Sequence, residues 1–367
     1  MTGTANKGRR NLPLAPAVVG IFLAVALTMA LLSTRAAADQ DPATVERRAW
    51  AMGTRLSVIV EADDRGTALD ASEAALGAVA EVEERLSTWV HDSELSRLNS
   101  AVPDSDFPIS PELEADLRVA THWWKETHGA FDPGIASLVV AWDLRGSGRE
   151  PSAFELKSAL AAAGLRHLAL DPGIARIDAA GFGIEEGGFG KGVALCQAAD
   201  AARSAGADCV VLDFGGQVAI EGDCRDFRVD IADPDLRDHR IATLKVRSGS
   251  VATSGNSERG LVVDGVARGH LLDPLSGSPA PDWGAVTVVA ADPVAADCLS
   301  TALYLMGPKA GGEWLQGRPE IGAVFAVRSG EGTRMTATPG LKGRLEATVG
   351  SLKYLQQEQA QQEEITQ

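Results

Sequence analysis

Tyrosine, cysteine and positive charge are all scarce in this sequence. It has two tyrosines and four cysteines in 367 residues, and 34 lysines and arginines against 50 aspartates and glutamates, a formal net charge of −16. A protein that binds nucleic acid needs a basic face, so this balance argues against a nucleic-acid partner. None of the cysteines belongs to a CxxC motif or a Cys/His cluster, which disfavours a zinc site.

The cysteines leave two states open. They are Cys196, Cys209, Cys224 and Cys298. An exported chain with an even number of cysteines can form disulfides, and Cys209–Cys224 is then the first pair to test. The alanine- and valine-rich surroundings are typical of core positions and favour buried free thiols instead.

The first 38 residues are typical of an export signal or a membrane anchor. Three basic residues precede an uncharged stretch over residues 11–34, and a small-residue cleavage site ends at Ala38. We prefer a cleaved signal peptide, but the stretch nearly reaches the length that spans a bilayer, so anchoring through residues 13–33 stays open. In both cases we expect an exported protein, in the periplasm or at the outer face of the cytoplasmic membrane.

Apolar residues make up 45% of the chain, enough for a sizeable core, and their patterning mixes helices and strands without a strict βαβ period. We therefore expect one large α+β domain over residues 39–350, loose at residues 39–46, and a polar, disordered tail over residues 351–367. Helical spacing predicts helices over residues 69–86, 112–128, 154–165, 191–205 and 294–306. Short β-rich runs predict strands over residues 56–60, 175–178, 209–214, 218–221, 227–232, 242–246, 286–290 and 323–327.

A glycine-rich run, Glu185-Glu186-Gly187-Gly188-Phe189-Gly190-Lys191-Gly192, directly precedes one predicted helix. Glycines let the backbone approach a ligand, the helix N-terminus offers N–H donors, and the lysine adds a charge for phosphate oxygens. The spacing matches neither the Walker loop nor the dinucleotide fingerprint. By itself the run is more often an ordinary glycine turn than a phosphate site.

Asp297 and Thr301 lie four residues apart and share one face of another predicted helix. A carboxylate and a hydroxyl are hard oxygen ligands, suited to Mg²⁺ bound together with a phosphate. The alternative, favoured when the pair is taken alone, is that Asp297 caps a local turn and Thr301 bonds back to its own helix.

Residues 251–259 and 269–277 form a third group, separated by one hairpin. The second piece is a good turn sequence, so its plain interpretation is a hairpin tip. It also contains His270, whose neutral imidazole could act as a base or orient a hydroxyl. A fourth run, Gly129-Ala130-Phe131-Asp132-Pro133, follows a predicted helix end, where a loop and a cap explain it equally well.

Taken together and in order, these motifs resemble the ApbE family of FAD:protein FMN transferases. The resemblance covers about Ala49 to Gly307 and implies a single, T-fold-like α+β domain. The motifs that carry it are Met52-Gly53-Thr54, Leu86-Ser87-Thr88-Trp89, residues 93–99, Gly129–Pro133, Gly187–Gly192, Phe214-Gly215-Gly216, Thr253–Arg259, His270–Gly277 and Ala296–Thr301.

The resemblance implies Mg²⁺-dependent cleavage of the FAD pyrophosphate and transfer of FMN to a threonine hydroxyl of an acceptor protein, with release of AMP. It implies metal ligands at Asp297, Thr301 and the main-chain carbonyl of Gly188. It implies FAD contacts from Met52, Trp89, Ala130, Phe131, Asp132, Glu185, Lys191 and His270. Two alternatives stay open: a catalytically weak FAD-binding carrier, and an Mg²⁺-dependent FAD pyrophosphatase that gives FMN and AMP.

The acceptor hydroxyl would be activated by His270, with Asp132 or Glu185 as rivals. Some positions depart from the family pattern. Glu185 stands where the family usually has Asp, and Trp89 stands at a tyrosine-type stacking position. The other departures replace a threonine and an acid of the family by Gly134 and Cys196. None of them removes an implied metal ligand.

Overall fold

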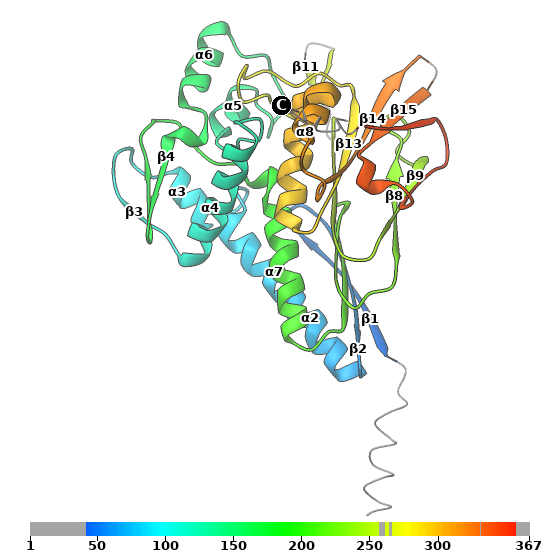
Figure 1. Ribbon diagram of the computed structural model, residues 1–367. Helices are drawn as coiled ribbons and strands as arrows, with labels where there is room; N and C mark the ends of the chain where they lie inside the picture. The colour runs from blue at the N-terminus through cyan, green and yellow to red at the C-terminus, as the bar shows by residue number, and fades with distance from the viewer. Residues whose placement is uncertain (1–41, 257–260, 264–265, 331, 357–367) are drawn as a thin grey trace, which may run out of the picture.

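A nine-stranded sheet runs through the molecule in the computed structural model, which describes residues 42–256, 261–263, 266–330 and 332–356 (Figure 1). Every pair of neighbouring strands in it is antiparallel except the last, which is parallel. In spatial order its strands are β1 (Ala43–Ala51), β2 (Thr54–Ala62), β6 (Cys209–Phe214), β7 (Gln217–Gly222), β10 (Gly249–Gly255), β13 (Gly284–Ala290), β14 (Gly322–Ser329), β15 (Gly332–Ala337) and β17 (Ser351–Tyr354).

Long helices cover one face of this sheet (Figure 1). The helix α4 (Pro111–Glu126) packs against these helices, and those that contact the strands are α2 (Arg65–Leu86), α7 (Gly190–Ser204) and α8 (Pro293–Trp314). The last of these is broken at Gly307, whose φ is +77° and which is followed by Pro308. The predicted helix over residues 294–306 ends at this break because proline cannot continue a regular helix.

A small sheet packs on the other face and shares a hydrophobic cluster with the large one. Its strands are β8 (Phe227–Ala232), β9 (Arg240–Val246) and β16 (Leu345–Ala347), in the order β16-β9-β8. Strand β13 is therefore covered on both faces, by α8 and by this cluster, and all seven of its residues are buried. Double coverage explains its continuous apolar sequence.

The remaining elements form a lobe beside the long helices (Figure 1). Its helices are α3 (Glu94–Asn99), α5 (Ala136–Ala141) and α6 (Ala153–Ala162), and its three-stranded sheet has the order β3 (Phe107–Pro108), β5 (Ile174–Ile177) and β4 (Leu168–Asp171). Short helices are found at Leu165–His167, Glu186–Gly188 and Pro339–Leu341, and β11 (Leu261–Val263) pairs with β12 (Val266–Arg268).

Each predicted helix and strand corresponds to an observed element, but two predictions at the ends of the domain are wrong. Residues 43–46 of the start that was predicted to be loose belong to strand β1, and the tail predicted from residue 351 begins with strand β17. Both are edge strands with exposed polar side chains, such as Glu46 and Arg48 in β1, which kept their hydrophobicity low. Residues 1–41 and 357–367 lie outside the described residues. None of the helices in the described part of the chain is long and apolar enough to cross a membrane.

Cys209 and Cys224 form a disulfide, so the expectation of free thiols is wrong for this pair. The hairpin of β6 and β7 pairs Cys209 with Gly222, two residues before Cys224. The Cα atoms of Cys209 and Cys224 therefore lie 5.0 Å apart. Cys298 is a buried free thiol and Cys196 a half-buried one.

Replacing both Cys209 and Cys224 with alanine should lower the free energy of unfolding by about 3 kcal/mol, because the crosslink closes a loop of 15 residues. Guanidinium unfolding of the oxidised wild type and the double variant measures this difference. Cys196→Ala, which removes a thiol without a crosslink, is the matched control. Equal midpoints for the oxidised wild type and the double variant would contradict the prediction.

Candidate active site

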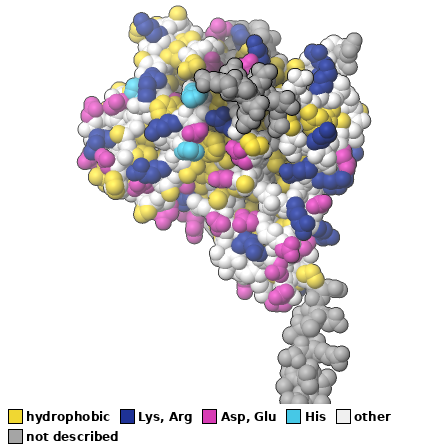
Figure 2. Space-filling view, in the orientation of Figure 1, with side chains coloured by type: hydrophobic (Ala, Val, Ile, Leu, Met, Phe, Trp, Pro, Cys, Tyr) yellow, Lys and Arg dark blue, Asp and Glu magenta, His cyan; other side chains and the backbone are white. Residues whose placement is uncertain are grey.

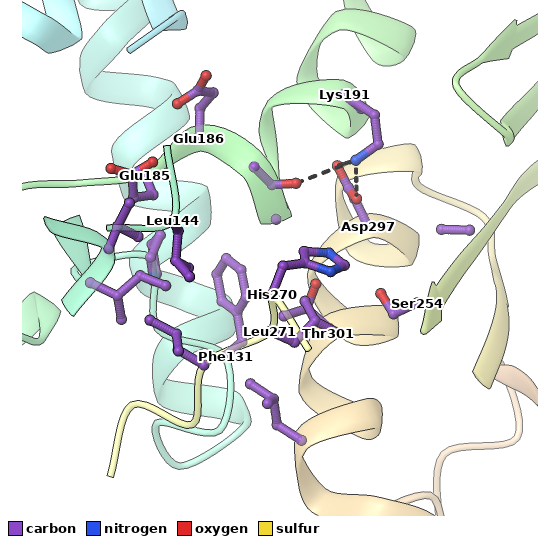
Figure 3. Close-up of a pocket in the computed structure, with 18 of the residues that line it drawn as sticks. Phe131, Leu144, Glu185, Glu186, Lys191, Ser254, His270, Leu271, Asp297 and Thr301 are labelled. Carbon is purple, nitrogen blue, oxygen red and sulfur yellow. Dashed lines mark hydrogen bonds and ion pairs between the residues drawn. The ribbon is translucent and has the colours of Figure 1, made fainter. Parts of the chain in front are cut away.

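A cavity of about 400 Å³ lies where the first turns of α7 and the middle of α8 meet several loops (Figure 3). Its lining includes all three predicted metal ligands and every residue predicted to hold FAD except Ala130, which is half-buried and packs against the main core. The polar or aromatic lining residues are Thr54, Trp89, Phe131, Asp132, Arg145, Glu185, Glu186, Lys191, Gln217, Thr253, Ser254, His270, Asp297 and Thr301.

The glycine-rich run forms the short helix Glu186–Gly188 and leads directly into α7. A Cβ at Gly192 would lie 2.6 Å from the carbonyl oxygen of Pro293, so only glycine allows α7 to approach the start of α8 this closely. A Cβ at Gly188 would lie 3.1 Å from the Phe131 ring and 3.4 Å from Thr301 Oγ1. The glycines therefore bring the two helix faces that carry Lys191 and Asp297 together.

Asp297 is 3% exposed and its carboxylate is held by groups from α7. Lys191 Nζ lies 2.9 and 3.2 Å from its two oxygens, and the Gly192 N–H donates to Oδ2 at 3.0 Å. The idea that Asp297 caps a local turn is therefore wrong, since Asp292 is the residue that caps α8. Figure 3 shows Asp297 and Thr301 on the same side of α8, facing the cavity.

The oxygens near this carboxylate fit Mg²⁺. Asp297, Thr301 and the backbone at Gly188 offer a carboxylate, a hydroxyl and a carbonyl, all hard donors. The described residues contain no group of three or more His, Cys, Asp and Glu able to hold a metal alone. Proteins often bind Mg²⁺ through one or two carboxylates plus substrate phosphates, which is the arrangement this donor set allows. The Lys191 ammonium beside the carboxylate already shows that the position accepts a cation.

An arginine that no sequence motif indicated lies at the aromatic part of the cavity. The guanidinium of Arg145 is 4.8 Å from the centre of the Trp89 ring and donates to Glu185 Oε2 at 2.6 Å. It also donates to the carbonyl oxygen of Thr88 at 2.9 Å. Burial raises the pKa of the Glu185 carboxyl, and Arg145 acts against that rise. The sequence around Arg145 shows only two arginines in a turn rich in glycine and serine, a pattern that indicates no ligand.

The sequence is similar to a known protein family over most of its length. The model of the ApbE family matches residues 52–325, well over half of the chain. The chain belongs to the ApbE family.

Two relatives named FAD:protein FMN transferase illustrate the extent of the similarity. The one from Vibrio cholerae is 28% identical over 271 residues, which cover 71% of this chain and 80% of the relative. The one from Rhodobacter capsulatus is 28% identical over 361 residues, which cover 95% of this chain and 66% of the relative.

Solved structures agree. The ApbE protein from Thermotoga maritima superposes with a TM-score of 0.72 at 28% identity, over 78% of this chain and 94% of that one. The Pseudomonas stutzeri flavinyl transferase ApbE, in its apo form, gives 0.72 at 25% identity over 84% and 98%. These matches confirm the predicted family, the single α+β domain and the expectation of an enzyme.

Two departures from the ApbE pattern have structural explanations. A Cβ at Gly134 would lie 2.7 Å from the backbone of both Gly164 and Leu165, so the close approach of the two loops requires glycine there. The longer side chain of Glu185 forms an ion pair with Arg145, with 2.6 Å between the charged atoms. Cys196 is half-buried on α7 outside the cavity lining, and burial raises the pKa of its thiol to about 11.

Asp132 organises the loop that follows α4 in this ApbE-family chain. It is buried, and its Oδ1 accepts hydrogen bonds from the N–H groups of Gly134 at 2.8 Å and Leu165 at 3.0 Å. Burial raises the pKa of its carboxyl, and these two amides act against the rise.

His270 lies at the base of a loop that the hairpin-tip interpretation described correctly. The Leu272–Pro279 bridge closes this loop. Inside it, the carboxylate of Asp273 accepts hydrogen bonds from two loop residues, and the Trp142 Nε1–H donates to the carbonyl oxygen of Gly277 at 2.7 Å. Figure 3 shows the imidazole pointing into the cavity. Residues 257–260 of the neighbouring motif lie outside the described residues.

Proposed function

We propose that this chain is an Mg²⁺-dependent FAD:protein FMN transferase, which moves FMN from FAD to a threonine hydroxyl of an acceptor protein and releases AMP. The observation that carries this is the combination, in one cavity, of a buried carboxylate and lysine at a helix N-terminus with the aromatic rings of Trp89 and Phe131. The names of the matching relatives support the same activity.

The phosphate end of FAD would bind at the start of α7. The N-cap residue Phe189 makes no side-chain hydrogen bond to this helix, and Asp297 takes only the Gly192 N–H, so a phosphate would meet the N–H groups before Gly192 and the positive end of the helix dipole. Lys191 is 28% exposed at its side chain, which leaves its ammonium accessible to a phosphate while it holds Asp297. The flavin would lie against the exposed face of Trp89, which is 67% exposed.

Mg²⁺ would be held by Asp297, Thr301 and the carbonyl of Gly188. When bound, it would neutralise the negative charge of the pyrophosphate and of the departing AMP. The threonine oxygen of the acceptor forms a bond to the FMN phosphorus while the bond from phosphorus to the bridging oxygen breaks, and AMP leaves with that oxygen. The hydroxyl proton passes to the imidazole of His270. The two carboxylates hold the walls of the cavity, Asp132 through two amides and Glu185 through Arg145.

We also propose that the chain works outside the cytoplasm. The disulfide between Cys209 and Cys224 supports this, because disulfides persist mainly in oxidising compartments. The N-terminal sequence points the same way.

The activity is tested by incubating the chain with FAD, Mg²⁺ and an acceptor protein. Transfer gives a fluorescent flavin band in a denaturing gel together with AMP, and both are lost when EDTA removes the metal. Release of AMP with no band would replace the proposal by a pyrophosphatase. Binding of FAD with neither product would replace it by a carrier.

A further inference from the structure

A compact turn presents Arg145 to the cavity. It follows α5 and is closed by the N–H groups of Gly146 and Gly148, which both donate to the carbonyl oxygen of Asp143. Asp143 adopts a φ of +52°, and its carboxylate accepts from the Ser147 N–H at 3.1 Å. The backbone around Arg145 is therefore fixed before any ligand binds.

The same turn is tied to the His270 loop. Trp142, the residue that ends α5, is buried and donates to the carbonyl of Gly277. The Arg149 N–H donates a hydrogen bond to the carbonyl oxygen of Trp142 at 3.0 Å. The segment that carries Arg145 is thus held in a fixed position relative to another wall of the cavity.

Arg145 joins two further walls through its side chain. One amino group donates to Thr88 Oγ1 at 2.5 Å and to Glu185 Oε2 at 2.6 Å, and the other donates to the Thr88 carbonyl. Thr88 Oγ1 in turn donates to Glu186 Oε2 at 2.5 Å. The guanidinium also lies against the ring of the adjacent Trp89. One cation therefore links the Trp89 segment to the start of the glycine-rich run.

We propose that Arg145 is a positioning residue for the flavin, which it serves by fixing the Trp89 ring and the Glu185 carboxylate at the cavity wall. This rests on the proposed function, since it takes FAD as the ligand. Without Arg145 the exposed Trp89 side chain would be free to change rotamer, and the flavin would have to order it on binding. Lysine is a poor substitute because it lacks the planar fork that bonds two partners and stacks on a ring at once.

The test is a double-mutant cycle on FAD affinity, measured by quenching of flavin fluorescence. Arg145→Met should weaken FAD binding about tenfold, the size of a partly exposed cation–π contact together with the lost ion pair. Arg145→Lys should recover only part of the loss. In a Trp89→Leu background the same Arg145→Met change should weaken binding less than threefold, because its main target is gone. In AMP release, the loss from Arg145→Met should appear mainly as a higher KM for FAD and less as a lower kcat.

Arg149→Met is the matched control, since Arg149 ends the same turn, pairs with Glu155 and lies outside the cavity lining. Near-ultraviolet circular dichroism shows whether each variant folds. If Arg145→Met does not fold, the cycle is measured with Arg145→Lys in its place. A wild type that binds no FAD would overturn the proposed function itself. If the wild type binds FAD and Arg145→Met binds it equally well, the positioning role alone is overturned. The same holds if the loss of FAD affinity in the double variant equals the product of the losses in the two single variants.

Discussion

Replacing Asp297 with asparagine should lower kcat/KM for AMP release from FAD by about 100-fold or more, a loss of about 3 kcal/mol of transition-state stabilisation. Asp297 is the only carboxylate among the three proposed metal ligands, and asparagine is a much weaker ligand for Mg²⁺. The variant also leaves Lys191 without its carboxylate partner. Steady-state AMP release at varied Mg²⁺ measures the effect, and added Mg²⁺ should restore little of it.

The asparagine variant should fold. Its amide oxygen can still accept from the Gly192 N–H, and the partly exposed Lys191 ammonium can turn to water. Asp292→Asn is the matched control on the same helix, because asparagine caps a helix N-terminus about as well as aspartate. Full activity in Asp297→Asn, with a wild-type dependence on Mg²⁺, would remove the metal assignment.

The charges around the cavity support the proposal that a divalent cation takes part in binding the pyrophosphate. Among the residues that the structure describes, the lining contains the carboxylates of Asp132, Glu185, Glu186 and Asp297 and the cationic side chains of Lys191 and Arg145. Acidic and basic side chains are interspersed over the face shown in Figure 2, and the whole chain carries a formal charge of −16. The attraction for a pyrophosphate therefore has to come from the helix terminus, Lys191 and a bound cation.

The ordered motifs predicted the residues of this cavity better than they predicted its contacts. Asp297 and Lys191 were both indicated, but their ion pair joins residues 106 positions apart and depends on how closely α7 approaches α8 at Gly192. Arg145 was missed for the same reason. Its role depends on three segments meeting, and its own turn has no periodicity or motif that would indicate a ligand.

In the fold, too, some elements could be predicted from the sequence and others could not. Strand β6 was predicted with its observed bounds because nearly all of its residues are buried. Strand β8 was also predicted with its observed bounds, although it is an edge strand of the small sheet, because its alternate residues Phe227, Val229 and Ile231 are apolar and pack on the shared cluster. The edge strands β1 and β17 were missed because an edge strand carries polar residues outward and gains its stability from pairing with a neighbour. The disulfide depended on hairpin register, which a count of cysteines does not contain.

Replacing His270 with asparagine should slow formation of the flavin–protein band by 10²- to 10⁴-fold, the usual contribution of a general base. FAD affinity should change by only a few fold, since the aromatic and phosphate contacts remain. The wild-type rate should rise with pH as the general base loses its proton, and the variant should lose this limb of the profile. His91→Asn is the control, because that side chain is fully exposed and outside the cavity lining.

Amide variants of the two rival carboxylates, Asp132 and Glu185, decide which residue is the general base. Asp132→Asn keeps an oxygen for the Gly134 and Leu165 amides, and Glu185→Gln keeps an oxygen for Arg145. If either carboxylate only holds the cavity walls, its amide variant should keep the pH-dependent limb and at least a tenth of the wild-type rate. If Asp132→Asn loses that limb while His270→Asn keeps it, the base is Asp132, and the raised pKa that burial gives its carboxyl would then suit the buried group to accept a proton.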